Sequence, residues 1–408
     1  MDDKLTRLIS SDEHDRVMRP IETAMTPPAC AYSSDDWFAL ERERIFQRHW
    51  MGILFECQIP SPGDVLPLEF LDMPLLAVRG DDGRVRVFHN ICPYDGCLVA
   101  TRPKQGCKHL EVLYHGWRYN LSGRLITAPY WNGDRGCSAA DMINVDTDLA
   151  EVRSEVRQGV LFVNLNGKAE SIDLWLAPWR QLVSQHFAID LLEPARFPDG
   201  RPWIEERTVQ ANWKTYQENA SINILHEAFT HDLYRKSDEV PRVNDHREPQ
   251  FKTWCDGALA AFSHHRDDSG DTYDPINLPT AGHDPSRQPA VGYFSTIYPN
   301  INVPLLDAMI KVNIAIPVSA GETRLLHLRF YRPEALADPR FQTEEHAIQN
   351  LFDVIHGEDR VAIEAVQQAR RSPAFSQHPY APFWDILHHY FNQLVMRDLN
   401  ARNSSHIS

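Results

Sequence analysis

The sequence lacks the features of a membrane-spanning, secreted or nucleic-acid-binding protein. No stretch reaches the ~18 uncharged apolar residues that a membrane-spanning helix needs. The first residues, Met-Asp-Asp-Lys-Leu-Thr-Arg, lack the basic and then apolar pattern of a signal peptide, so we expect a cytoplasmic protein. Positive charge is in deficit, because 41 Lys and Arg face 56 Asp and Glu. The formal charge of −15 disfavours a nucleic-acid or anionic-membrane partner.

Cysteine is also scarce, and its count is odd. Seven cysteines are scattered over 408 residues, which argues against a disulfide framework and favours metal ligands or buried free thiols. Hydrophobic residues, in contrast, make up 43% of the chain and include ten Trp, which is ample for buried cores. At ~150 residues per domain, the length predicts two or three domains.

The pattern along the chain predicts an N-terminal segment followed by a β domain. Residues 1–50 are expected to be a helical segment, in which Ser33-Ser-Asp-Asp36 caps a helix. Residues 51–167 alternate short apolar stretches with tight turns, such as the hairpin signal around Asp81-Asp-Gly83. We therefore expect residues 51–167 to form a compact all-β domain.

In residues 168–408, strands in succession with flanking helices predict an α+β domain with an antiparallel sheet. Residues 235–290 are rich in Pro, Asp, His and Gly, and we expect a long loop over the functional site. Strands are expected at 203–211, 291–297, 309–317 and 323–331, and helices at 175–192, 344–370 and 383–399. Residues 212–234 are expected to be helical or helix-rich.

Three residues of this last domain are candidate ligands of a single iron. Two His and one carboxylate are the usual protein ligands of a ferrous ion that activates oxygen. His226 and His231 are five residues apart, which on an ideal helix turns them ~140° from each other, so they converge only if the helix bends or ends between them. Asp359 starts an otherwise apolar helical stripe, so its carboxylate is expected to point inward, where a buried charge needs a partner. The alternative is that both His are ordinary polar residues and that Asp359 belongs to a surface run of charges.

Several motifs follow one another along the chain: Cys92-Pro-Tyr94, Val112-Leu-Tyr-His115-Gly-Trp117, Asn212-Trp-Lys214, Glu218-Asn219, His226, His231, Pro299-Asn300, and Glu358-Asp359 with Glu364-Ala-Val-Gln367. In this order they resemble the oxygenase α subunit of a Rieske non-heme iron oxygenase. The resemblance covers about residues 30–400. It implies a Rieske-type β domain, a helix-grip catalytic domain and iron held by His226, His231 and Asp359. It also implies a trimer in which the cluster of one subunit supplies electrons to the iron of the next.

The Rieske-type motif departs from the family at two of its four ligand positions. A Rieske cluster takes two Cys on one iron and two His on the other. Cys92 and His115 occupy one position of each kind, whereas Tyr94 stands where a His belongs and Val112 where a Cys belongs. Because Val has no lone pair, we expect no normal [2Fe-2S] cluster in this chain. We expect Tyr94 to contribute to a local core with Trp117 and Tyr114.

Nearby residues leave open a zinc site in place of the cluster. Cys97, Cys107 and His109 follow Cys92 closely, and together these four could bind zinc. The simpler interpretation is that they are buried or surface thiols and a solvated His.

The relay position of the family is also altered. The family usually carries an acid three residues before the first His, where it links the iron ligand to the neighbouring cluster. Here the residue is Asn223, which can hydrogen-bond to an imidazole but carries no charge and exchanges no proton. Glu227 could substitute in part, although its side chain should point elsewhere.

The sequence supports three functions, of which we favour the first. It is an oxygenase subunit that hydroxylates a small organic substrate with O2 at a mononuclear Fe(II). Its electrons would come from a reductase or ferredoxin, or from an intact Rieske α-type subunit, in a homo- or hetero-trimer or hexamer. The second is a non-catalytic structural or regulatory subunit of such an assembly, and the third is a zinc- or ligand-binding protein on the same fold. The substrate is open, and five apolar residues could line its pocket, although we favour the core for most of them: Phe262, Phe294, Ile297, Leu305 and Leu306.

Overall fold

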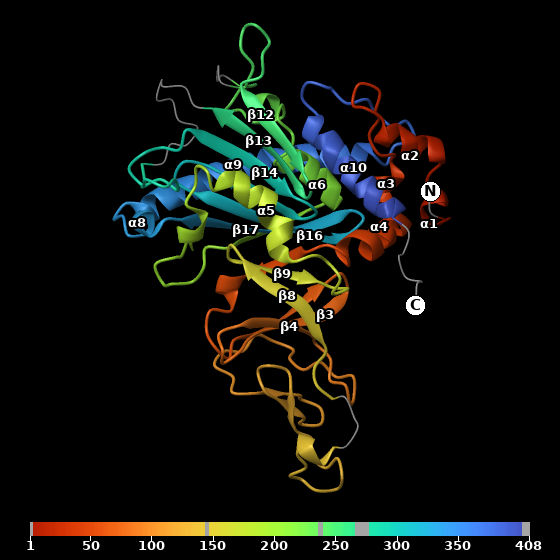
Figure 1. Cartoon of the computed structure of the whole chain (residues 1–408), viewed down its shortest axis with the longest axis vertical. Helices are drawn as coiled ribbons and strands as arrows, with labels where there is room; N and C mark the ends of the chain where they lie inside the picture. Colours follow the sequence, from red (N-terminus) through yellow and green to blue (C-terminus); the bar gives the residue numbers. More distant parts are fainter. Residues whose placement is uncertain (1–2, 143–146, 236–239, 266–276, 402–408) are drawn as a thin grey trace. The chain divides into compact units, whose positions relative to one another are not determined.

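The chain folds into two units in the computed structural model (Figure 1). The structure describes residues 3–142, 147–235, 240–265 and 277–401. The smaller unit is Trp50–Ala169, and the larger unit joins Met1–His49 to Glu170–Ser408. The N-terminal segment, which we expected to be separate from the catalytic domain, is therefore part of the larger unit.

The smaller unit is built from antiparallel β-sheets. Its larger sheet has six strands in the order β1-β9-β8-β4-β3-β2, and the smaller one has the order β5-β6-β7. The hairpin predicted around Asp81-Asp-Gly83 joins β3 to β4, and Gly83 adopts the left-handed backbone (φ 75°) of its turn. The strands are β1 Met51–Phe55, β2 Val65–Phe70, β3 Met73–Arg79, β4 Val85–His89, β5 Leu110–Glu111, β6 Arg118–Tyr119, β7 Leu125–Thr127, β8 Glu151–Arg157 and β9 Val160–Asn164.

The larger unit contains an antiparallel sheet of eight strands among the described residues. The order is β10-β17-β16-β15-β14-β13-β12, and β11 also pairs with β17. This sheet and the helices around it confirm the predicted α+β class. The strands are β10 Glu193–Pro194, β11 Glu205–Val209, β12 Phe251–Asp256, β13 Leu259–His265, β14 Val291–Ile297, β15 Ile301–Leu305, β16 Ile310–Ser319 and β17 Glu322–Tyr331.

Helices cover both faces of this sheet (Figure 1). On one face, Trp179 of α5 donates a hydrogen bond to Ser295 of β14. On the other face, α9 reaches β16 through His356 and Lys311. The helices are α1 Asp3–Thr6, α2 Ser11–Met18, α3 Cys30–Ser33, α4 Asp35–Glu41, α5 Ile172–Val183, α6 Trp213–Ala220, α7 Glu227–Thr230, α8 Pro333–Leu336, α9 Phe341–Ala369 and α10 Ile386–Asn400. None of the helices in the described ranges is long and apolar enough to cross a membrane.

The N-terminal segment is fastened to the larger unit by a buried ion pair. Glu41 of α4 is fully buried and lies against the Lys214 ammonium of α6. Trp213 and Trp37 both donate hydrogen bonds to the same carboxylate. The residues Trp213 and Lys214 of the Asn-Trp-Lys motif therefore hold the N-terminal segment in place.

Two expectations about secondary structure are wrong. The expected loop at 235–290 contains the hairpin of β12 and β13, which extends the sheet at its edge. An edge strand pairs on one side only, and the partly exposed β12 shows little alternation between apolar and polar residues. Within that range, residues 236–239 and 266–276 lie outside the described residues. The helix expected at 175–192 begins earlier, because Ser171 caps it, and it ends at Val183.

Candidate metal centre

The two candidate His residues flank a single helical turn. His226 immediately precedes α7 (Glu227–Thr230), and His231 follows it with an extended backbone (φ −100°, ψ 118°). The helix therefore ends between them, as the five-residue spacing requires for convergence. Their ring centroids are 5.4 Å apart.

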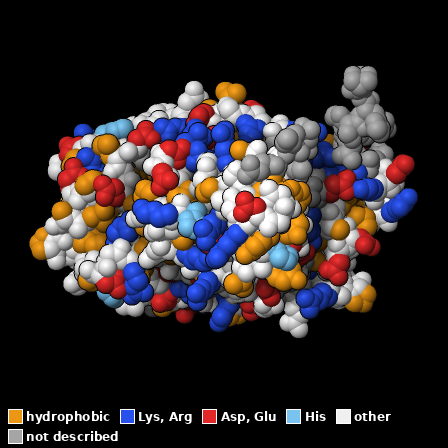
Figure 2. Space-filling view, turned by 90° about the horizontal axis from the view of Figure 1, so that it is seen from below, with side chains coloured by type: hydrophobic (Ala, Val, Ile, Leu, Met, Phe, Trp, Pro, Cys, Tyr) orange, Lys and Arg blue, Asp and Glu red, His pale blue; other side chains and the backbone are white. Residues whose placement is uncertain are grey.

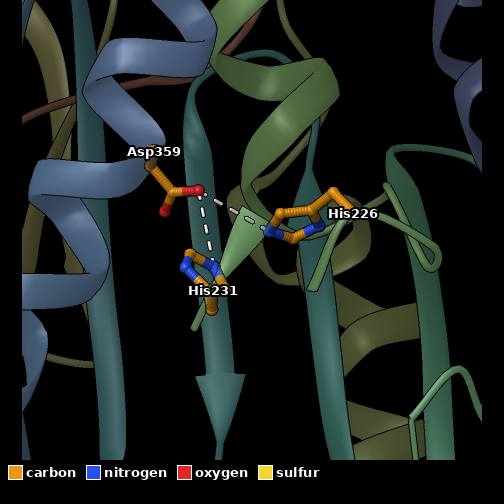
Figure 3. A group of neighbouring side chains, drawn as sticks. All are labelled: His226, His231 and Asp359. Carbon is orange, nitrogen blue, oxygen red and sulfur yellow. Dashed lines mark ion pairs between the residues drawn. The ribbon is translucent and has the colours of Figure 1, made fainter. Parts of the chain in front are cut away.

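Asp359 completes the group from the middle of the long helix α9. Its Oδ1 lies 3.7 Å from Nε2 of His226 and 3.5 Å from Nε2 of His231 (Figure 3). One ligand atom from each of the three residues lies within 4.8 Å of the others. The side chain of His231 is 2% exposed and that of Asp359 18%, so the group is sheltered and still reachable. Two imidazoles and one carboxylate on one side fit a ferrous ion with open positions.

Neighbouring groups orient each of these side chains. Nδ1 of His231 donates to the Glu358 carboxylate at 2.9 Å, and Nδ1 of His226 donates to the backbone carbonyl of Asn223 at 2.7 Å. Both Nε2 atoms are thereby left for a metal. The Asn219 amide donates to Oδ1 of Asp359 at 3.0 Å. Sequence reasoning placed Asn219 and Glu358 in motifs but missed these contacts, which depend on the fold.

At the relay position, the backbone of Asn223 contacts His226, and not its side chain as the sequence led us to expect. Asn223 meets His226 through its backbone carbonyl, so this contact does not depend on the identity of its side chain. Glu227 forms a buried ion pair with Arg242 at 2.8 Å. Glu227, which we considered as a partial substitute for the relay acid, is therefore already paired with Arg242.

A cavity of about 420 Å³ adjoins the three residues. This is the size of a pocket for a small organic molecule. Of the five apolar residues proposed from the sequence, Phe294 and Leu306 are among its lining residues. The cavity also has a basic side, which was not predicted from the sequence. Its apolar wall includes Phe294, Leu306, Met309, Leu325, Ile348 and Phe352, and its basic side includes Arg207, Lys311, His327, His356 and Arg360.

In the smaller unit, the four positions that the resemblance assigns to a Rieske cluster can be compared with their surroundings. Cys92 is buried, which raises the pKa of its thiol, and its sulfur lies 3.6 Å from the Tyr119 hydroxyl. His115 donates to Asp95 at 2.6 Å. Val112 is buried in the apolar core of this unit, where it offers no donor atom.

Tyr94 does not fill a buried core as expected. Its ring stacks on Trp117 with centroids 4.9 Å apart and an interplanar angle of 1°. It is nevertheless 50% exposed, because it lies on the outer side of the buried Trp117. Other large hydrophobic side chains of this unit are exposed too, and Figure 2 shows hydrophobic side chains next to Lys and Arg on the face seen from below. The exposed residues are Ile91, Tyr94, Leu98, Leu113, Tyr114, Ile126, Tyr130 and Trp131.

The structure does not gather the alternative zinc ligands. Cys92, Cys97 and Cys107 are free thiols, and His109 lies 3.5 Å from Glu111. Within the described ranges, His226, His231 and Asp359 are the group of three or more His, Cys, Asp or Glu residues placed to hold a metal ion. The three iron-ligand candidates thus converge, and the four zinc-ligand candidates do not.

Comparison with known protein families identifies the larger unit. The family described as "Ring hydroxylating alpha subunit (catalytic domain)" matches residues 184–401, more than half of the chain. The family described as "Rieske [2Fe-2S] domain" matches residues 49–139. The chain belongs to the ring-hydroxylating α-subunit family. The resemblance and the two-part fold predicted from the sequence are confirmed.

Individual relatives of this ring-hydroxylating α subunit are oxygenases. The α subunit of 2-aminobenzenesulfonate 2,3-dioxygenase of an Alcaligenes species is 27% identical over 72% of this chain and 71% of the relative. The chloroplastic choline monooxygenase of Arabidopsis thaliana is 22% identical over 91% of this chain and 82% of its own. Among solved structures, naphthalene 1,2-dioxygenase from Rhodococcus has a TM-score of 0.75 at 16% identity, covering 98% of this chain and 99% of its own. A quaternary ammonium Rieske monooxygenase has a TM-score of 0.74 at 19% identity, covering 94% and 98%.

The family uses a mononuclear iron in its catalytic domain, and its members are oxidoreductases. The donor set of His226, His231 and Asp359 agrees with that use. The match of residues 49–139 to the Rieske [2Fe-2S] domain points to a cluster in the smaller unit and does not support our expectation that the cluster is absent. Of the four ligand positions that the resemblance assigns, only Cys92 and His115 carry a cluster ligand.

Proposed function

We propose that this α subunit holds one ferrous ion at His226, His231 and Asp359 and hydroxylates a small organic substrate with O2. The observation that carries the proposal is the convergence of the three ligand atoms within 4.8 Å beside a cavity of about 420 Å³. When bound, the ferrous ion supplies the centre at which O2 is activated. The reaction class is that of the family.

The chain's own residues would prepare this centre in three ways. Glu358 and the carbonyl of Asn223 hold the two imidazoles with Nε2 toward Asp359. Asn219 fixes one oxygen of Asp359. The apolar wall of the cavity would hold the body of the substrate and limit the access of bulk water.

We propose further that no [2Fe-2S] cluster forms in this chain. The support is chemical: the buried Val112 has no donor atom, and the Tyr94 ring stacks on Trp117 where a His ligand is expected. Electrons would then come from a reductase or ferredoxin, or from an α subunit with an intact cluster. The exposed aromatic residues of the smaller unit support its assembly with other chains, as a homo- or hetero-trimer or hexamer. In this assignment residues 51–167 are the Rieske-type domain and residues 168–408 the catalytic domain.

The incomplete cluster positions also favour a second candidate, a non-catalytic subunit of an oxygenase assembly. Measurement of ferrous binding under anaerobic conditions separates the two. We expect one ferrous ion per wild-type chain, and loss of stoichiometric binding in His226→Ala and in His231→Ala without loss of the fold. His246→Ala, which changes an exposed His outside the group, should bind iron as the wild type does. Full iron loading of both ligand variants would refute the site, and a folded wild-type chain without iron would favour the non-catalytic subunit.

The substrate class remains to be assigned within this function. The names of the relatives point to molecules of opposite charge, since one is a dioxygenase of 2-aminobenzenesulfonate and another a monooxygenase of choline. The charge of the cavity is therefore the property that matters for the choice.

A further inference from the structure

The cavity has a basic side built from three elements. Lys311 lies on β16, His327 on β17 and His356 on α9. In the register of the sheet, Lys311 pairs with Arg329 and Asn313 pairs with His327, so these side chains share the face that α9 covers. Lys311, His327 and His356 all line the cavity that adjoins the metal ligands.

Lys311 is buried beside a neutral hydrogen-bond partner. The residue is 2% exposed, and its Nζ lies 2.7 Å from Nε2 of His356 and 3.9 Å above the centre of the Phe352 ring. In the described part of the chain, no carboxylate lies within 4.0 Å of this ammonium to form an ion pair. Burying a cation without a neighbouring carboxylate costs free energy of folding. A lysine at such a position therefore points to a function that requires its charge.

The neighbouring carboxylate is already engaged by two arginines. Glu205 lies 2.6 Å from Arg329 and 3.0 Å from Arg207. Arg329 also binds Glu345 at 2.8 Å, and Arg207 also binds Asp353. The two guanidinium groups therefore have their own counter-ions, and the ammonium of Lys311 does not share in these short contacts.

Unpaired buried nitrogen atoms accompany the lysine. Nδ1 of His356 and Nε of Arg207 are buried without a hydrogen-bond partner. Because the ammonium of Lys311 donates to Nε2 of His356, the proton of that neutral ring is on Nδ1, which makes Nδ1 a free donor. Both residues line the cavity. Buried donors without partners cost free energy, and a ligand that brings acceptor oxygens would satisfy them.

We propose that the cavity binds a substrate that has an aromatic or apolar body and one anionic group, a carboxylate or a sulfonate. The anionic group would lie at Lys311 and His356, and the apolar body against the wall that includes Phe352. This inference names the substrate class of the proposed oxygenase and rests on that function.

The distance from the basic side of the cavity to the metal ligands suits one small molecule. His356 and Asp359 are three residues apart on α9, so they lie side by side, with ~5–6 Å between their Cβ atoms. A single ring can therefore reach from the basic side to the metal ligands. A neutral hydrocarbon would leave Lys311 without a counter-ion, and a quaternary ammonium group would meet a like charge.

The test compares three probes of similar shape by calorimetry on the full chain. The probes are benzenesulfonate, the neutral methyl phenyl sulfone and the cationic benzyltrimethylammonium ion. We expect benzenesulfonate to bind at least ~10-fold more tightly than the sulfone, the effect of one hydrogen bond to a charged group. Both metal-stripped and iron-loaded protein should show this preference, because the anion lies at Lys311 and not on the metal. Equal binding of sulfonate and sulfone, or tightest binding of the cation, would overturn the inference with wild-type protein alone.

Variants locate the binding group. Lys311→Met should remove the preference for benzenesulfonate and leave the affinity for the sulfone within about twofold, whereas Lys311→Arg should retain the preference. Lys252→Met, which removes an exposed lysine of β12, is the matched control. A preference that persists in a folded Lys311→Met protein would contradict the assignment. Iron content is measured on the same samples, so full iron loading without an anion preference refutes this inference alone, and anion preference without iron binding refutes the oxygenase proposal alone.

Discussion

At the scale of single residues, the candidate iron ligands depend on neighbours that do not touch the metal. Glu358 accepts the Nδ1 proton of His231, which fixes the tautomer and turns Nε2 toward Asp359. The charge of Glu358 also makes the imidazole a better donor. Glu358 precedes the ligand Asp359 in the sequence, and its side chain is hydrogen-bonded to the second ligand, His231.

Replacing Glu358 by Gln should weaken iron binding without abolishing it. The amide oxygen of Gln can still accept the hydrogen bond, but it removes the negative charge, and we expect ~10–100-fold lower ferrous affinity. The measurement is an anaerobic competition titration with a chromophoric chelator. Glu344→Gln, on the same helix about four turns away, is the control. Unchanged affinity in Glu358→Gln would show that this hydrogen bond does not tune the site.

The pH dependence of anion binding should report Lys311. Burial and neighbouring cations lower the pKa of its ammonium from 10.5 to about 7. Because the anion binds the protonated form, the affinity for benzenesulfonate should fall about tenfold per pH unit above pH 7. It should stay nearly constant there in Lys311→Arg, since the guanidinium remains charged. Affinity that is independent of pH between 6 and 9 in the wild type would contradict the role of Lys311. The charged and titratable groups that face this ammonium are Glu205, Arg207, His327, Arg329, His356 and Asp359.

The same pKa shift also affects the stability of the fold, which should rise with pH where the affinity for the anion falls. Between pH 7 and 10.5 the unfolded chain binds a proton at Lys311 that the folded chain has lost, so this residue makes the fold more stable as pH rises through that range. Lys311→Met should remove this contribution. The measurement is urea unfolding at pH 7 and pH 9. The free energy of unfolding should change less between these two pH values in Lys311→Met than in the wild type.

At the scale of elements, the ion pair between α4 and α6 fastens the N-terminal segment. Lys214 and Glu41 are both fully buried, and burial lowers the pKa of the lysine and raises that of the carboxyl. Lys214→Met leaves Glu41 buried without its cation and should destabilise the fold by ~3–5 kcal/mol in urea unfolding. Part of this loss should return in the double variant with Glu41→Gln. Arg180→Met, which breaks an exposed pair with Asp190, should cost at most ~1 kcal/mol, and an equal cost for both single variants would refute the account.

Elements with strong local signals could be predicted from the sequence, and those that depend on distant partners could not. The β3–β4 hairpin was found because its turn and its alternating strands are local. The spacing of His226 and His231 showed only that they converge if a helix bends or ends between them, as α7 does. That the two His share a metal was implied by the family resemblance. The β12–β13 hairpin was missed because Pro- and Asp-rich flanks surround an edge strand. Lys311 was missed because a lysine in a strand normally points to solvent, and its burial depends on α9, β11 and β17.

At the scale of the whole molecule, the two units differ in chemical completeness. The larger unit brings all three candidate iron ligands together beside a cavity. In the smaller unit, the Rieske-type positions keep Cys92 and His115 and lose two donors to Tyr94 and Val112. This distribution is the basis of our proposal that the subunit holds its own catalytic metal and receives electrons from another chain.

The most direct test is to assay iron and acid-labile sulfide in one anaerobically purified sample and to record its EPR spectrum after reduction with dithionite. The account predicts one iron per chain, no acid-labile sulfide and no signal of a reduced Rieske centre, because Val112 and Tyr94 cannot replace the missing ligands. Stoichiometric sulfide together with a Rieske signal from this chain alone would contradict it.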